Sequence, residues 1–212
     1  MTWTRDFSRV FHWERRDAAY FLTWKLHGAW QWPETFPVHM SEGQRFVAAN
    51  EVLDNPAIGP KWLNVPEVAE AVRDVFLSGA ASGEYQLGAW VLMPNHVHLL
   101  MRPAGELSRV LSNLKGRSAR AANLVLNRTG QPFWAKDYFD RWIRDSAQAE
   151  RTVRYIEQNP VRAGLCRLAE DWRWSSARSR NATKVACPTT SPSIGRYFES
   201  GHLTGLERLS GS

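Results

Sequence analysis

The segment that most constrains the fold of this chain is a pair of apolar runs joined by a Pro-Asn turn at 94–95. The runs at 85–93 and 96–102 are typical of the two strands of a hairpin. His96 and His98 open the second strand, and side chains at i and i+2 of a strand point to the same face. The sequence therefore predicts two imidazoles side by side on a rigid, buried strand.

This histidine pair supplies two ligands for a divalent metal ion, because imidazole is a common ligand of such ions. The alternative is that one or both are core histidines with satisfied hydrogen bonds. For a single histidine that alternative would be favoured, whereas a pair that opens a core strand directly after a turn favours metal ligation. A third ligand is needed, and the candidates are Glu157, Gln158 and Asn159.

Composition favours a polyanionic partner. The formal net charge is +6, from 27 Lys and Arg against 21 Asp and Glu, which is typical of proteins that bind nucleic acid. Cys166 and Cys187 form neither a zinc knuckle nor a disulfide framework, which fits a reducing compartment. No apolar stretch approaches the roughly 18 residues that span a bilayer. We therefore expect a cytoplasmic protein without membrane contact.

The order of the expected elements predicts an α+β fold. Besides the hairpin, we expect a strand at 19–29, helices at about 41–53, 66–78 and 107–126, and an extended segment at 133–143. A last helix begins at Asp145 or Ser146 and ends near Gln158, because Pro160 and Gly164 stop it. Hairpins combined with helices favour a ferredoxin-like antiparallel sheet with helices on one face.

The functional domain is expected at 19–180. An N-terminal extension at 1–18 precedes it, and a tail rich in Ser, Thr, Gly and Pro follows at 181–212. The histidine pair lies on a central strand of this domain, and the last helix carries the tyrosine considered next.

Tyr155 and Asn159 lie four residues apart in the last expected helix and so share one helical face. If that face points to the histidine pair, one residue can hold a metal ion while the other attacks beside it. A tyrosine beside a divalent ion suits transesterification of phosphodiesters. Two alternatives remain open: Tyr155 is a core residue and Asn159 caps the helix, or Tyr138 is the nucleophile. The sequence identifies no base for the phenol.

Arginines on two helices are candidate DNA contacts. Arg109, Arg117 and Arg120 fall within an arc of roughly 80° on the helix at 107–126, where they could follow phosphates. A solvated rim of an amphipathic helix is the alternative. Arg154 adds positive charge beside the proposed nucleophile.

Several motifs occur in a fixed order between residues 19 and 178, and together they resemble a known family. They are MPNHVHLLM, DYFDRWIRD, VRYIEQNPVRAG and DWRWSSA. This set resembles the single-tyrosine HUH transposases of the IS200 type, and most closely their REP-associated tyrosine transposase branch. The resemblance implies that His96 and His98 bind metal, that Tyr155 is the nucleophile, and that Asn159 is the third ligand, where the family usually has glutamine.

The resemblance also implies a reaction. The expected function is an Mg²⁺- or Mn²⁺-dependent endonuclease and strand transferase in DNA transposition, which cleaves single-stranded DNA beside a REP-like hairpin through a 5′-phosphotyrosine. The protein is expected to act as a monomer or homodimer. One alternative is a domesticated hairpin-binding regulator that does not cut. A metal-dependent hydrolase is a third possibility, disfavoured because the other four histidines show no strand-end pattern.

Overall fold

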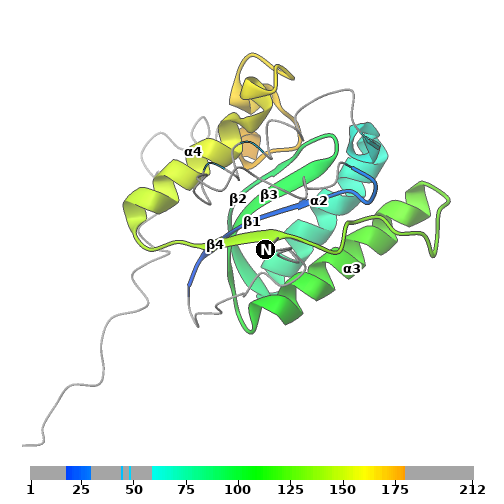
Figure 1. Cartoon of the computed structure of the whole chain (residues 1–212), viewed down its shortest axis with the longest axis horizontal. Helices are drawn as coiled ribbons and strands as arrows, with labels where there is room; N and C mark the ends of the chain where they lie inside the picture. The colour runs from blue at the N-terminus through cyan, green and yellow to red at the C-terminus, as the bar shows by residue number, and fades with distance from the viewer. Residues whose placement is uncertain (1–17, 30–43, 45–47, 49–58, 180–212) are drawn as a thin grey trace, which may run out of the picture.

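The structure is a computed structural model that describes residues 18–29, 44, 48 and 59–179. Its centre is one antiparallel sheet with the strand order β2-β3-β1-β4 (Figure 1). The strands are β1 (Tyr20–Lys25), β2 (Tyr85–Leu92), β3 (His96–Pro103) and β4 (Phe139–Trp142). The helices are α2 (Pro66–Ala81), α3 (Leu107–Val125) and α4 (Ser146–Arg162), with short 3₁₀ turns at Trp62–Asn64 and Ala169–Asp171.

The two central strands, β1 and β3, are buried on both faces of the sheet. All six residues of β1 are buried, although the strand includes Thr23 and Lys25. Alternate side chains divide between two cores: Leu22 and Trp24 pack with α2 and α3, whereas Phe21 packs with α4. The antiparallel register places Thr23 opposite His98 and Lys25 opposite His96, so these four side chains lie on the α4 side.

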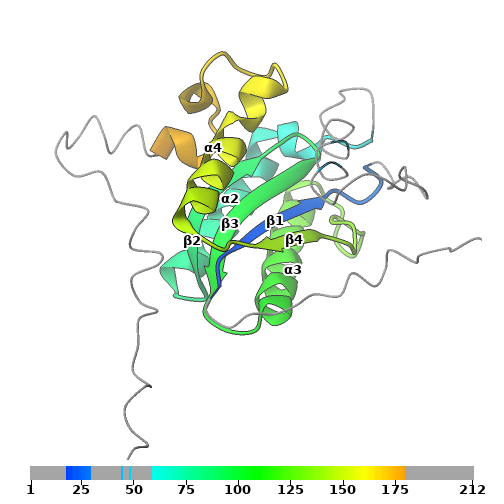
Figure 2. The same ribbon diagram turned by 60° about the vertical axis from the view of Figure 1, so that its left-hand side comes forward.

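Helices therefore cover both faces of the sheet (Figure 2). The α+β class and the antiparallel sheet with its histidine pair on a central strand are confirmed, but the expectation of helices on one face needs correction. The reason is that an apolar stripe on α4 (Ala149, Val153 and Ile156) packs on the second face of the sheet against Phe21 and Leu100 of the central strands.

Helix α4 continues past Pro160, where the sequence predicted its end. The Asp145 side chain accepts a hydrogen bond from the backbone N–H of Gln148 at 2.7 Å and so caps the helix start, as expected. Proline removes only one intrahelical donor, and the backbone N–H of Ala163 still donates to the Asn159 carbonyl at 3.0 Å. The helix ends where Gly164 adopts a φ of 69°.

The other expected elements match closely or lie outside the described residues. The strand expected at 19–29 ends at Lys25, and only 139–142 of the segment at 133–143 is paired as a strand. Gln44 and Ala48 are helical, as expected. The rest of the helix at 41–53, the extension before residue 18 and the tail at 181–212 lie outside the described residues.

The segment after α4 runs along the outer edge of β2. The backbone N–H of Leu92 donates to the Trp174 carbonyl at 2.8 Å, and Ser175 forms a bridge with Val91. Ser176 joins this edge to α4: its Oγ accepts from the backbone N–H of Trp90 at 3.1 Å and donates to Glu157 at 2.9 Å. These bonds cover part of a sheet edge and fix α4 against it. Within the described residues, no helix is long and apolar enough to cross a membrane.

Candidate active site

His96 and His98 lie fully buried on β3 and face α4. Their Nε2 atoms are 3.1 Å apart, so the two imidazoles present these nitrogens to one point. Each Nδ1 has its own partner: the Asn95 side-chain oxygen lies 2.7 Å from that of His96, and the Thr23 hydroxyl lies 2.7 Å from that of His98. Both rings are thus oriented by hydrogen bonds on the side away from the shared point.

These partners determine where the ring protons can reside. The carbonyl oxygen of the Asn95 amide only accepts, so the proton of neutral His96 is on Nδ1 and its Nε2 presents a lone pair. The Thr23 hydroxyl both donates and accepts, so it can satisfy Nδ1 of His98 in either tautomer. His98 can therefore donate to His96 through Nε2, or present a second lone pair beside it.

Burial keeps both imidazoles neutral. It lowers the pKa of His96 to about 3. The pKa of His98 is also well below its ordinary value, because of burial first, then the neighbouring His96, then the positive charge of Arg162. Burial likewise lowers the pKa of Lys25, opposite His96, and the Asp137 carboxylate opposes that shift. Neutral imidazole is the form that binds metal ions.

Tyr155 extends from α4 toward this pair. Its half-buried ring meets His98 edge to face, with ring centroids 5.7 Å apart and an interplanar angle of 74°. Phe21 contacts the same ring from β1, also at 5.7 Å. Tyr138, the competing nucleophile, packs instead against the core on the α2 and α3 side, where Lys115 lies over its ring. The structure therefore places Tyr155, and not Tyr138, beside the histidines.

Asn159 is the buried polar residue one turn after Tyr155. It is 0% exposed, and neither its amide nitrogen nor its amide oxygen has a hydrogen-bond partner. Burial of a polar group without a partner lowers folding stability by about 1–3 kcal/mol, so a ligand that pairs with Asn159 would offset this cost. Glu157 is engaged with Ser176. Across 18–29, 44, 48 and 59–179, no cluster of three or more His, Cys, Asp or Glu residues could hold a metal ion.

The family comparison matches the part of the chain that builds this site. Residues 61–159 match a family model described as "Transposase IS200 like". That range includes the histidine pair, Tyr155 and Asn159. This part of the chain is therefore similar to IS200-like transposases.

Two relatives agree with this family. The REP-associated tyrosine transposase of Escherichia coli (strain K12) is 26% identical over 110 residues, which are 50% of this chain and 63% of that protein. The matched region thus spans less than two thirds of the relative. A solved structure of a REP-associated tyrosine transposase bound to a REP hairpin covers 96% of this chain and 99% of its own, with a TM-score of 0.57 at 16% identity. At that identity the similarity shows a shared fold.

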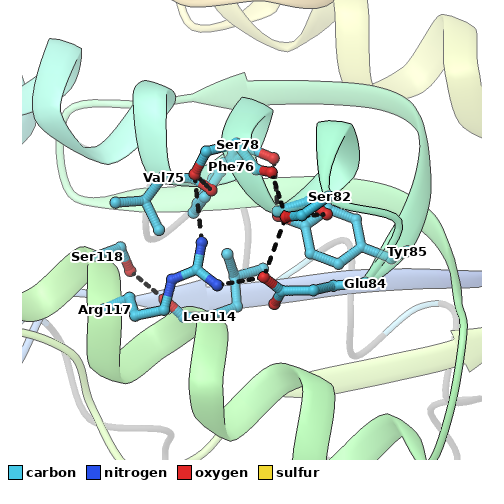
Figure 3. A network of polar contacts seen from close by, with 10 residues as sticks. Val75, Phe76, Ser78, Ser82, Glu84, Tyr85, Leu114, Arg117 and Ser118 are labelled. Atoms are coloured by element: carbon cyan, nitrogen blue, oxygen red, sulfur yellow. Dashed lines mark hydrogen bonds and ion pairs between the residues drawn. The ribbon is translucent and has the colours of Figure 1, made fainter.

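Three of the four candidate DNA-contact arginines lie across the sheet from Tyr155. Arg109, Arg117 and Arg120 are exposed on α3, whose buried face packs in the other core. Figure 3 shows that Arg117 pairs with Glu84 and donates to the Ser78 hydroxyl at 3.2 Å. Its guanidinium joins α3 to α2. Arg154 is exposed on α4, and DNA contact by these arginines stays a prediction.

Sequence reasoning missed two residues of the site, Thr23 and Asn95, and indicated Arg162 only as one of several positive charges around the proposed nucleophile. Thr23 lies 75 positions from His98, and no local pattern indicates the strand register that joins them. The sequence indicates Asn95 only as a turn residue. Arg162 follows the expected helix end, yet its guanidinium carbon lies 4.2 Å from the centroid of the Tyr155 ring. Its signal is a spacing of seven residues, almost two full helical turns.

Proposed function

We propose that this protein is a metal-dependent single-stranded DNA endonuclease and strand transferase that acts at DNA hairpins, with Tyr155 as its nucleophile. The observation that carries the proposal is the contact of the Tyr155 ring with His98, within an IS200-like domain of one chain. The REP hairpin bound to the structural relative supports a hairpin as substrate. The net charge of +6 is consistent with a nucleic-acid partner.

The residues that would hold Mg²⁺ or Mn²⁺ are His96 and His98 through Nε2 and Asn159 through its amide oxygen. Convergent, neutral imidazoles and an unpartnered buried amide support this donor set. The bound ion would polarise a phosphate oxygen and offset the charge that develops there. The Nδ1 partners Asn95 and Thr23 would keep the rings in position as the ion binds.

The chain itself supplies the nucleophile. Tyr155 loses its phenolic proton to solvent, and its oxygen attacks the phosphorus of a single-stranded phosphodiester. The new Oη–P bond forms as the P–O3′ bond breaks, and the departing 3′ oxygen takes a proton and becomes a hydroxyl. The phosphate remains on Tyr155 at the 5′ end of the DNA. Because one phosphate ester replaces another, a 3′-hydroxyl can reverse the step and join strands without ATP.

The proposal is tested with a hairpin oligonucleotide that carries a labelled single-stranded flank. With Mn²⁺ we expect a covalent protein–DNA adduct that resists denaturing gel electrophoresis. Tyr155→Phe is expected to abolish the adduct and retain hairpin binding, whereas Tyr138→Phe is expected to retain the adduct. An adduct lost only in Tyr138→Phe would refute the assignment. Hairpin binding that is indifferent to EDTA, without cleavage in any divalent ion, would instead favour a non-cutting regulator.

The ligand set is tested with Asn159→Leu, which replaces an unpartnered amide by an apolar group of similar size. We expect the melting temperature in EDTA to stay equal or rise, while Mn²⁺ affinity measured by calorimetry falls at least tenfold. Asn123→Leu is the matched control, because Asn123 is also buried but donates to the Gln131 carbonyl at 2.7 Å. This control should lose stability and keep its Mn²⁺ affinity. Equal Mn²⁺ binding in Asn159→Leu would exclude Asn159 as a ligand.

A further inference from the structure

Arg162 returns to the Tyr155 face because α4 continues past Pro160. Seven residues turn an α-helix by two turns less about 20°, so the two side chains leave the helix in nearly the same direction. Helical side chains tilt toward the N-terminus, which lets the long arginine extend back over the tyrosine. Its guanidinium carbon lies 4.2 Å from the ring centroid. One ring of α4 thus contacts both a histidine of the pair and an arginine.

Stacking alone assigns no function to an arginine in this chain. Arg128, Arg144 and Arg173 also lie over aromatic rings, in each case a tryptophan. Arg162 differs from these arginines, because its ring belongs to the proposed nucleophile and that same ring contacts His98. Arg162 is therefore close to both halves of the site.

The guanidinium of Arg162 remains available for a ligand. The residue is exposed, and within residues 59–179 no carboxylate forms an ion pair with it. Arg117, by contrast, is engaged by Glu84. Arginine offers five N–H donors in a planar fork that matches phosphate oxygens, and it stays protonated throughout. An anion between Tyr155 and the histidines would meet these donors.

We propose that Arg162 binds a nonbridging oxygen of the scissile phosphate and holds it against Tyr155 during cleavage and joining. This inference rests on the proposed function. As the Tyr155 Oη–P bond forms and the P–O3′ bond breaks, negative charge accumulates on the nonbridging oxygens. Arg162 stabilises that charge through hydrogen bonds and neither gains nor loses a proton.

Cleavage rates of three variants provide the first test. Arg162→Gln should lower the single-turnover rate constant about 100-fold at saturating hairpin DNA, which is the effect of removing one donor to a developing oxyanion. Arg162→Lys keeps the charge but loses the fork, so it should recover part of that loss. Arg151→Gln is the matched control, because Arg151 is also exposed on α4, one turn before Tyr155. It should cleave within twofold of the unmodified protein.

A methylphosphonate scan provides the second test and needs no cleavage. In the Tyr155→Phe background, each phosphate of the single-stranded flank is replaced in turn by an uncharged methylphosphonate, and hairpin affinity is measured. We expect one position where this replacement weakens binding about tenfold with Arg162 and less than twofold with Arg162→Gln. A purely structural arginine would show the same loss in both proteins at every position.

The two tests separate failure of this inference from failure of the proposed function. A protein that forms no adduct but shows the Arg162-dependent position would contradict cleavage and support the phosphate contact. A protein that forms the adduct at an undiminished rate in Arg162→Gln, and shows no such position in the scan, would overturn the role of Arg162 and leave the nuclease intact.

Discussion

The Thr23 hydroxyl is the contact that most directly tests how the site is built. Thr23 is 6% exposed on β1, and its hydroxyl lies 2.7 Å from Nδ1 of His98 on the neighbouring strand. Thr23→Val keeps the branched shape that suits a strand and removes only the hydroxyl. Nδ1 of a fully buried imidazole then loses this partner.

The expected cost follows from that loss. A buried polar group left unpaired costs about 1–3 kcal/mol of unfolding free energy. For a domain of this size, about 1 kcal/mol lowers the melting temperature by about 2–4 °C, so Thr23→Val should melt about 2–12 °C lower in EDTA. Because Nδ1 also orients the ring, Mn²⁺ affinity should fall about 10–100-fold.

The assay compares thermal unfolding by circular dichroism with Mn²⁺ titration by calorimetry. Thr152→Val is the matched control, because the Thr152 hydroxyl donates to the Gln148 carbonyl within α4 at 2.9 Å and does not contact a histidine. The control should change the melting temperature little and leave Mn²⁺ affinity unchanged. If Thr23→Val matches the unmodified protein in both measurements, the hydroxyl does not hold His98 and the argument for an oriented pair fails.

Three further changes have expected signs. Because burial lowers the folded-state pKa of His96 to about 3, the metal-free protein should lose stability as pH falls below the ordinary histidine value near 6.5, and this shift of His96 should cost about 2 kcal/mol at pH 5. The lowered pKa of His98 acts in the same direction. Equal urea midpoints at pH 7.5 and pH 5 in EDTA would contradict this prediction. Gly79→Ala should destabilise the protein by about 1–2 kcal/mol, because its new Cβ would lie 2.5 Å from the Tyr85 hydroxyl. Gly116→Ala in α3 should stabilise the protein by up to about 1 kcal/mol, because its new Cβ meets no neighbour within 4 Å. Melting temperatures of the two variants that move in the same direction would contradict this prediction. Ser176→Ala should lower the free energy of unfolding in denaturant by about 1–3 kcal/mol, because the buried backbone N–H of Trp90 loses its acceptor. An unchanged midpoint would contradict this and show that water takes the place of the hydroxyl.

Local sequence patterns predicted the elements that form between residues close to one another in the sequence. The hairpin expected at 85–93 and 96–102 is β2 and β3, and the helix expected at 107–126 is α3 with one residue fewer. Periodicity works here because burial of one face repeats every two or 3.6 residues. The predicted end of α4 was wrong because Pro160 removes only one hydrogen-bond donor and does not stop the helix. The helix ends before Gly164, which adopts a left-handed conformation.

Long-range contacts could not be predicted from these patterns. Thr23 pairs with His98 because β1 and β3 align in one particular register, and a strand shifted by one residue would present its other face. The choice between Tyr138 and Tyr155 likewise depends on which side of the sheet each segment packs. A charged residue directly precedes each tyrosine, Asp137 and Arg154 respectively, so charge alone does not separate them.

The sheet separates the basic side chains of α3 from those of α4, and under the proposed function this changes where DNA contacts should be sought. On the α3 side, Arg117 is paired with Glu84 and joins two helices. Arg154 and Arg162 are exposed on α4, the helix that carries Tyr155, and α4 lies on the opposite face of the sheet from α3. Under the proposed function, a strand cleaved by Tyr155 passes over α4, so we expect the arginines that contact its phosphates near the break to come from that side. We expect Arg109 and Arg120 to contact only DNA that extends around the sheet.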